Sequence, residues 1–123
     1  MSDGAGVFNA PMRVLVLDDE PLILMDLQFT LEDAGLEPVT ASSLDRALEL
    51  IEAQTLDAAV LDVNLGRGQT CQPVAERLKE LGIPFILHTG DLERRGEMVT
   101  KFEVPIVNKP SSAESVVDAV KNL

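Results

Sequence analysis

Short apolar runs alternate with amphipathic stretches along this chain five times, beginning at Arg13. The runs are rich in Val, Leu and Ile and predict strands at residues 14–17, 38–41, 58–61, 84–87 and 104–107. In the stretch after each run, apolar side chains recur at helical spacing, which predicts five helices. The fourth of these, at 91–102, has the fewest apolar positions and contains Gly96, so we expect it to be the least stable.

Strands that are almost wholly apolar must be covered on both faces, and their alternation with helices requires crossover connections between parallel strands. The pattern therefore predicts an α/β fold, a doubly wound parallel sheet flanked by helices. We expect one folded domain over residues 13–123. Residues 1–12 lack hydrophobic periodicity and are expected to form a flexible N-terminal segment.

Ligands of such sheets bind at the carboxyl ends of the strands, so the polar residues that follow the apolar runs are candidate site residues. These residues are Asp18, Asp19, Glu20, Asp62, Asn64, His88, Thr89, Gly90, Asn108, Lys109 and Pro110. Three aspartates crowded together are unfavourable unless a cation neutralises them. Because His88 is the one candidate ligand that is not an oxygen donor, the set favours Mg²⁺, or Mn²⁺ as another hard divalent ion, over zinc.

The same group of residues suits phosphoryl chemistry. A carboxylate can act as the nucleophile and form an aspartyl phosphate. The ammonium of Lys109 is suited to pair with the added phosphoryl oxygens, and the hydroxyl of Thr89 to hydrogen-bond them. The strand ends therefore predict a metal-assisted phosphoryl site.

Four short motifs, each after its own strand and in this order, resemble the receiver (CheY-like) domain of bacterial two-component response regulators. The motifs are Asp18-Asp19-Glu20, Leu61-Asp62-Val63-Asn64, Thr89-Gly90 and Lys109-Pro110. The resemblance covers Arg13 to Leu123. It implies a flavodoxin-like sheet of five strands in the order 2-1-3-4-5, flanked by five helices.

The resemblance also implies roles for these residues. Asp62 would accept a phosphoryl group from a sensor histidine kinase or a histidine phosphotransfer protein. Asp19, Asp62 and the backbone carbonyl of Asn64 would ligate Mg²⁺, with Asp18 acting partly through water and Glu20 as an auxiliary acidic residue. Thr89 and Lys109 would contact the phosphate.

A narrower resemblance links residues 62–66 and 84–90 to the single-domain subgroup named for its FATGUY motif. The chain also departs from these patterns. Ile106 stands where the typical receiver has an aromatic residue, so rotation of a ring is excluded as the switch. Ser111 replaces a frequent Phe, and His88 and Asp91 replace an Ala and an aromatic of the subgroup. We expect His88 to be packed or solvated rather than a proton relay.

Composition narrows the function classes. Ten basic and 21 acidic residues give a net charge of −11, which argues against nucleic acid or an anionic membrane as a partner. No apolar run exceeds four residues, so neither a membrane span nor a signal peptide is expected, and the predicted location is the cytoplasm. Cys71 is the one cysteine, which excludes an internal disulfide, and we expect it to be a helix-start residue rather than a reactive thiol.

Together these features predict a single-domain response regulator that catalyses only its own phosphorylation and slow dephosphorylation. Since the sequence ends at Leu123, the expected output is contact with a downstream protein, or transfer of phosphate as a shuttle or sink. One alternative is a phosphorylation-independent adaptor, for which Ile106 leaves room. The other is a phosphohydrolase with an Asp nucleophile, which is disfavoured because Asp18 and Asp19 are adjacent instead of two residues apart.

Overall fold

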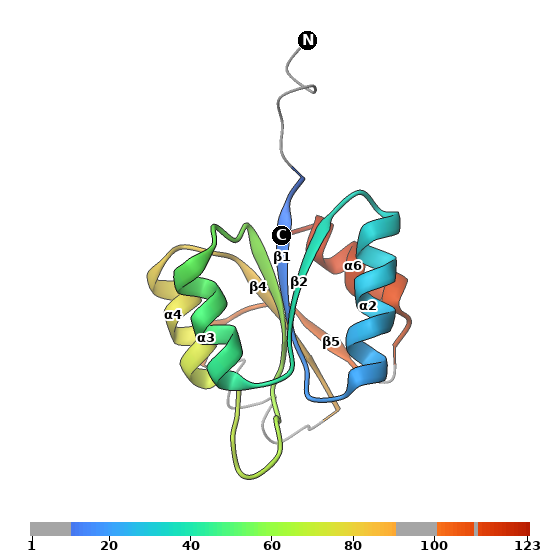
Figure 1. The fold of residues 1–123 in the computed structure, drawn as a ribbon. Helices are drawn as coiled ribbons and strands as arrows, with labels where there is room; N and C mark the ends of the chain where they lie inside the picture. The colour runs from blue at the N-terminus through green and yellow to red at the C-terminus, as the bar shows by residue number, and fades with distance from the viewer. Residues whose placement is uncertain (1–10, 91–100, 110) are drawn as a thin grey trace.

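A computed structural model describes residues 11–90, 101–109 and 111–123. It contains one five-stranded sheet with helices on both faces (Figure 1). The strands are β1 (Arg13–Leu17), β2 (Glu37–Ala41), β3 (Ala58–Asp62), β4 (Phe85–Thr89) and β5 (Ile106–Asn108). The helices are α2 (Pro21–Asp33), α3 (Leu44–Ala53), α4 (Gln72–Glu80) and α6 (Ala113–Lys121).

The sheet confirms the predicted topology. All four strand pairs are parallel, and the order is β2-β1-β3-β4-β5. In Figure 1, α2 and α6 lie on one face of the sheet, and α3 and α4 lie on the other. The carboxyl ends of β1, β3, β4 and β5 therefore meet at one edge, where the candidate residues lie.

The helix count and the fifth strand differ from prediction. Five helices were expected, and the described residues contain four; the helix predicted at 91–102 falls mostly outside them, although Lys101 and Phe102 are helical. The last strand begins at Ile106 rather than 104 and ends at Asn108. Glu103 adopts a left-handed φ of 53°, and Pro105 has no N–H to donate to a ladder, so regular pairing starts only after them. Of the predicted N-terminal segment, 1–10 lie outside the described residues.

Side chains on the strands alternate between two apolar layers. Leu15, Leu61 and Leu87 pack toward α3 and α4, whereas Val16, Val60 and Ile86 pack toward α2 and α6. By this alternation His88 lies on the face of α2 and α6, and Thr89 lies on the face of α3 and α4. His88 and Thr89, which are neighbours at the end of β4, therefore lie on opposite faces of the sheet.

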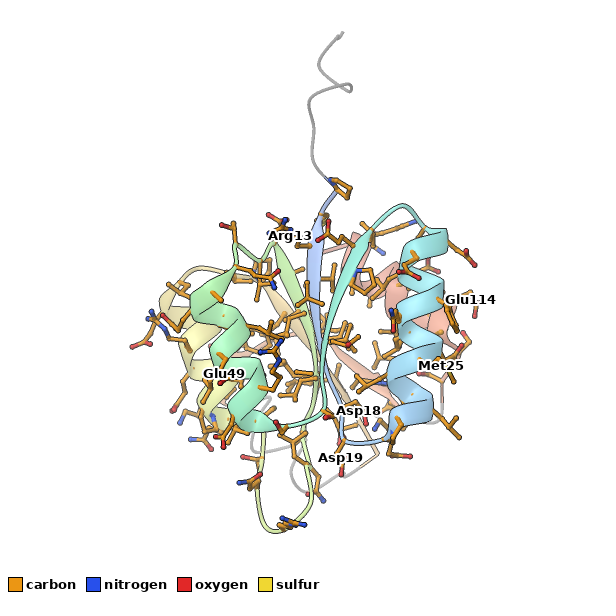
Figure 2. The ribbon with its side chains drawn as sticks, in the orientation of Figure 1. Arg13, Asp18, Asp19, Met25, Glu49 and Glu114 are labelled. Atoms are coloured by element: carbon orange, nitrogen blue, oxygen red, sulfur yellow. The ribbon has the colours of Figure 1, made fainter. Side chains whose placement is uncertain are left out.

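Helix α2 is apolar on two sides. Leu27 and Leu31 are buried against the sheet, in agreement with the predicted stripe. Leu22, Met25 and Phe29 are 75%, 46% and 57% exposed, and Met25 points outward from α2 in Figure 2. In the described part of the chain, no helix combines the length and the apolar character needed to span a membrane.

Candidate functional site

Most of the candidate residues converge in one cleft at the carboxyl edge of the sheet; His88 and Asn108 do not line it, and Pro110 lies outside the described residues. This cleft has a volume of about 380 Å³, and Figure 2 shows Asp18 and Asp19 at this end of the molecule. It is lined by Asp19, Glu20, Asp62, Asn64, Gly66, Thr89, Gly90 and Lys109. Residues from four strand ends and from the loop after β3 are therefore brought together, as the parallel sheet requires.

The acidic group after β1 is built around Asp18. Asp18 is 1% exposed, and its carboxylate accepts a hydrogen bond from the backbone N–H of Glu20 at 2.9 Å. Its own N–H donates to the carbonyl of Ala41 at 3.2 Å, which fixes the end of β1 beside β2. One carboxylate oxygen from each of Asp18, Asp19 and Glu20 lies within 4.8 Å of the others. Such a group of oxygen donors fits a hard divalent cation.

Asp62 ends β3 and is 5% exposed. Burial and the neighbouring Asp18 carboxylate raise the pKa of Asp62 from its ordinary 3.8 to about 7, against the opposing effect of the Lys109 ammonium. The negative charge gathered here is therefore unfavourable as it stands. A divalent cation at this position would relieve it, so the residues present fit the Mg²⁺ that the sequence predicts.

Lys109, just after β5, lies between acidic residues of two segments, the loop after β1 and the end of β3. Its Nζ lies 3.1 Å from Asp18 Oδ2, 3.4 Å from Asp62 Oδ1 and 3.8 Å from Glu20 Oε1. Burial alone would lower the pKa of Lys109, but the Asp62 and Asp18 carboxylates outweigh it and raise that pKa. The ammonium stays charged at neutral pH and within reach of any group bound to Asp62.

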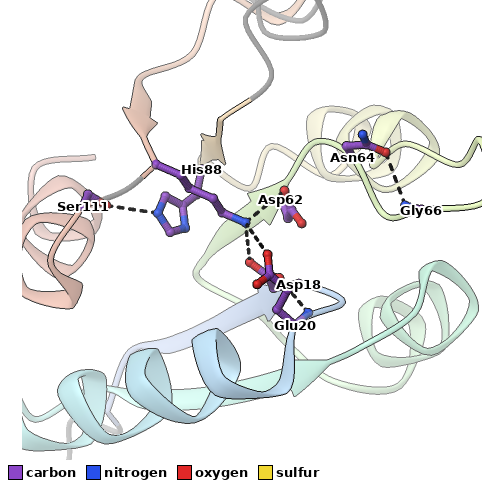
Figure 3. A network of polar contacts seen from close by, with 8 residues as sticks. Asp18, Glu20, Asp62, Asn64, Gly66, His88 and Ser111 are labelled. Atoms are coloured by element: carbon purple, nitrogen blue, oxygen red, sulfur yellow. Dashed lines mark hydrogen bonds and ion pairs between the residues drawn. The ribbon is translucent and has the colours of Figure 1, made fainter.

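The loop after β3 passes close to the acidic group. Asn64 Oδ1 accepts a hydrogen bond from the N–H of Gly66 at 3.3 Å, so the Asn64 side chain is turned toward the loop and away from Asp62 (Figure 3). Gly66 has a φ of 80°, and a Cβ there would lie 3.5 Å from Asp19 Oδ2. Glycine thus permits the left-handed turn, whereas a Cβ would make only an ordinary van der Waals contact with Asp19. The run Asn64-Leu65-Gly66 was the sequence signal for this turn.

Two predictions about single residues are consistent with the geometry. Burial raises the pKa of the Cys71 thiol to about 12, and Cys71 stands at the N-cap of α4, as expected of an unreactive helix-start residue. His88 is 5% exposed, and burial, followed by the charge of Lys109, lowers its pKa, so it is a packed, neutral imidazole. Ile106 is half-buried on the face of α3 and α4, opposite Leu87.

The raised pKa of Asp62 predicts that neutralising this carboxylate increases the free energy of unfolding by an amount that depends on pH. Since the folded protein binds this proton more tightly than the unfolded chain, Asp62 stabilises the fold below about pH 4, and that contribution is lost as pH rises through 7. In metal-free protein at about pH 8, we expect Asp62→Asn to raise the free energy of unfolding by about 1–3 kcal/mol. The gain should shrink as pH falls toward about 4.

Thermal unfolding with EDTA at several pH values measures this effect. Asp118→Asn, on the exposed side of α6, is the matched control and should change little at any pH. Added Mg²⁺ should reduce the difference in melting temperature between wild type and Asp62→Asn, because the bound cation neutralises the charge that the substitution removes. A variant less stable than wild type at high pH would contradict the electrostatic account.

Known proteins resemble this chain along most of its length. The sequence profile of the response regulator receiver domain matches residues 14–121. The alginate biosynthesis transcriptional regulatory protein AlgB of Pseudomonas syringae is 36% identical over 109 residues, which are 89% of this chain and 20% of that protein. The transcriptional regulatory protein PdtaR of Mycobacterium tuberculosis is 33% identical over 85 residues, 68% of this chain and 42% of that protein. The chain thus spans less than half of these relatives, and their names lend no support to the expected absence of a nucleic-acid partner.

Solved structures match over nearly their full length. SdrG from Sphingomonas melonis Fr1 is 34% identical with a TM-score of 0.75, covering 93% of this chain and 99% of that one. The response regulator TrrA of Thermotoga maritima, solved in complex with Mg²⁺ and BeF, is 27% identical with a TM-score of 0.78, covering 90% and 97%. The narrower FATGUY resemblance is not tested by these matches and stays a prediction.

Proposed function

Because the chain belongs to the response regulator receiver domain family, we propose that Asp62 accepts a phosphoryl group in a Mg²⁺-dependent reaction. The donor is a phosphohistidine of a sensor histidine kinase or of a histidine phosphotransfer protein. The observation that carries this proposal is the position of Asp62, buried at a strand end, 3.4 Å from the Lys109 ammonium and in one cleft with the acidic group after β1.

Different residues of the chain supply the nucleophile, the ligands of the cation and the stabilisation of charge in this reaction. A carboxylate oxygen of Asp62 attacks phosphorus as the bond from phosphorus to the donor nitrogen breaks. Asp19, Asp62 and the Asn64 backbone carbonyl would hold the cation, with Asp18 acting partly through water; when bound, Mg²⁺ neutralises charge on the phosphoryl oxygens. Lys109 stabilises the same charge from the other side, since its ammonium already reaches Asp62.

Phosphorylation then redistributes the ion pairs of Lys109. A phosphoryl group brings roughly 1.5 to 2 negative charges, which compete with Asp18 and Glu20 for the ammonium. The hydroxyl of Thr89, a residue that lines the same cleft, would hydrogen-bond the added oxygens. We propose that this change also shifts the helix predicted at 91–102, most of which lies outside the described residues.

We infer that the phosphorylated protein signals by contacting a downstream protein in the cytoplasm, or that it passes phosphate on as a shuttle or sink. On this proposal it is a single-domain signalling protein and not an enzyme acting on other substrates. Ile106 favours one competing function, a phosphorylation-independent adaptor, because the aromatic side chain of the usual switch is missing from the face of α3 and α4.

Intact mass after incubation with phosphoramidate and Mg²⁺ tests the proposal. Phosphoramidate carries the same bond between phosphorus and nitrogen as phosphohistidine. We expect one added phosphoryl group with Mg²⁺ and none with EDTA. Steady release of phosphate without an adduct would favour the phosphohydrolase instead. A folded, Mg²⁺-binding protein with neither adduct nor release would favour the adaptor.

A further inference from the structure

His88 occupies an unusual place for a polar side chain. It is the one histidine of the chain, 5% exposed, and pairs in register with Asp62 on β3 and with Val107 on β5. Its side chain lies on the face of α2 and α6, within the apolar layer that contains Ile86. An apolar residue would fill this position without the cost of burying an imidazole.

Among the described residues, the imidazole has a single hydrogen-bond partner. His88 Nε2 lies 3.1 Å from the hydroxyl oxygen of Ser111 (Figure 3), and within the described part of the chain its Nδ1 has none. In either neutral tautomer one ring nitrogen is therefore left unpaired, which is unfavourable in a buried position. Packing alone does not account for a histidine here, and the contact with Ser111 is the feature that distinguishes it.

Ser111 belongs to the segment that carries Lys109. It is exposed, follows Lys109 by two residues, and directly precedes Ser112, the N-cap of α6. Two hydrogen bonds from the end of β4 bracket this segment: the N–H of Lys109 donates to the Thr89 carbonyl at 3.0 Å, and His88 bonds Ser111.

On the side of α2, Lys109 and Ser111 border a cleft of about 420 Å³ between α2 and α6. It is lined by His88, Lys109 and Ser111 together with Ile23, Asp26, Leu27, Ala113 and Val116. The hydrogen bond between His88 and Ser111 therefore links the residue two positions after Lys109 to β4 beside this cleft.

We propose that His88 is a positioning residue for phosphoryl transfer to Asp62, and that its hydrogen bond to Ser111 fixes the segment from which Lys109 reaches the reacting group. The inference rests on the proposed function. Stabilisation of transferring phosphoryl oxygens depends on an ammonium held in one place, so a looser segment slows transfer. The carboxylates that would hold Mg²⁺ lie just after β1 and at the end of β3, and we expect their affinity for the cation to change little when this contact is lost.

Ser111→Ala tests the hydrogen bond without disturbing the core. We expect the initial rate of adduct formation from phosphoramidate to fall about three- to ten-fold, the usual effect of losing one neutral hydrogen bond. The dissociation constant for Mg²⁺ should stay close to wild type. The melting temperature should fall by about a few degrees, because the buried His88 Nε2 loses its partner, so rates are compared well below it. Ser111→Thr keeps the hydroxyl and should retain the wild-type rate.

Ser42→Ala is the matched control. Ser42 is exposed and directly precedes Ser43, the N-cap of α3, just as Ser111 precedes Ser112, and among the described residues its hydroxyl has no hydrogen bond. The control should react at the wild-type rate. In a second arm, the double variant His88→Leu/Ser111→Ala should react at the same rate as His88→Leu alone, because both substitutions remove the same hydrogen bond.

The outcomes separate this inference from the proposed function. If wild type is phosphorylated and Ser111→Ala reacts as fast as Ser42→Ala, His88 has no positioning role and the phosphoacceptor stands. If wild type itself gains no phosphoryl group, the proposed function falls and this inference falls with it. Should His88→Leu fail to fold, the comparison of Ser111→Ala, Ser111→Thr and Ser42→Ala decides by itself.

Discussion

Asp62→Asn is expected to abolish phosphorylation, lowering the rate of adduct formation on the order of 10³-fold or more. Asparagine matches aspartate in size, so the buried end of β3 keeps its shape. Its carboxamide oxygen is a poor nucleophile and carries no charge for a cation. Intact mass after incubation with phosphoramidate and Mg²⁺ should therefore show only the unmodified variant.

Asp118→Asn is again the control, because it removes an exposed carboxylate from α6 and should leave the reaction unchanged. The alternative acceptors are Asp18 and Asp19. Asp18 is engaged by the Glu20 N–H and the Lys109 ammonium. An adduct that forms on Asp62→Asn at the wild-type rate would assign the nucleophile to one of these and overturn the proposal.

The sheet and the place of the site were predictable because both follow from short-range patterns. Apolar runs identify buried strands, and a parallel sheet places their carboxyl ends at one edge. Asp18, Asp62 and Lys109, although distant in sequence, were therefore expected to meet. In the structure a carboxylate oxygen of Asp18 lies 3.1 Å and one of Asp62 lies 3.4 Å from the Lys109 Nζ.

What the sequence left open depends on local backbone direction. Nothing in the pair Asp18-Asp19 indicates which carboxylate turns inward. The structure shows that Asp18 is buried, because it accepts the Glu20 N–H while its own N–H bonds Ala41, and that Asp19 is exposed. The shortened fifth strand has a similar cause in the left-handed turn at Glu103.

Side-chain contacts between distant parts of the chain were beyond prediction for a different reason. His88 and Ser111 are 23 residues apart and belong to no shared periodicity, so their hydrogen bond is a consequence of how β4 and the start of α6 pack. The sequence marked both positions as departures from the family pattern. It gave no sign that the two departures touch, which only the folded arrangement shows.

Lys109→Ala should reduce the rate of phosphorylation about 100-fold or more, the loss typical of removing one group that stabilises charge in the transition state. The reason is that the Lys109 side chain is 17% exposed and its ammonium lies 3.4 Å from Asp62, so that few water molecules can take its place. Affinity for Mg²⁺ should not fall and is expected to rise a few-fold, because a cation that competes for Asp18 and Asp62 has been removed.

A lower rate of phosphorylation without a loss of Mg²⁺ affinity distinguishes Lys109 from a residue that only stabilises the fold. The metal-free variant should be less stable than wild type, since Asp18 and Asp62 lose their partner, so rates are compared at saturating Mg²⁺. Lys121→Ala, which removes an exposed ammonium from the end of α6, is the control and should leave both quantities unchanged. If Lys109→Ala lost Mg²⁺ affinity in proportion to its rate, the lysine would act by organising the acidic residues and not by contacting the phosphoryl group.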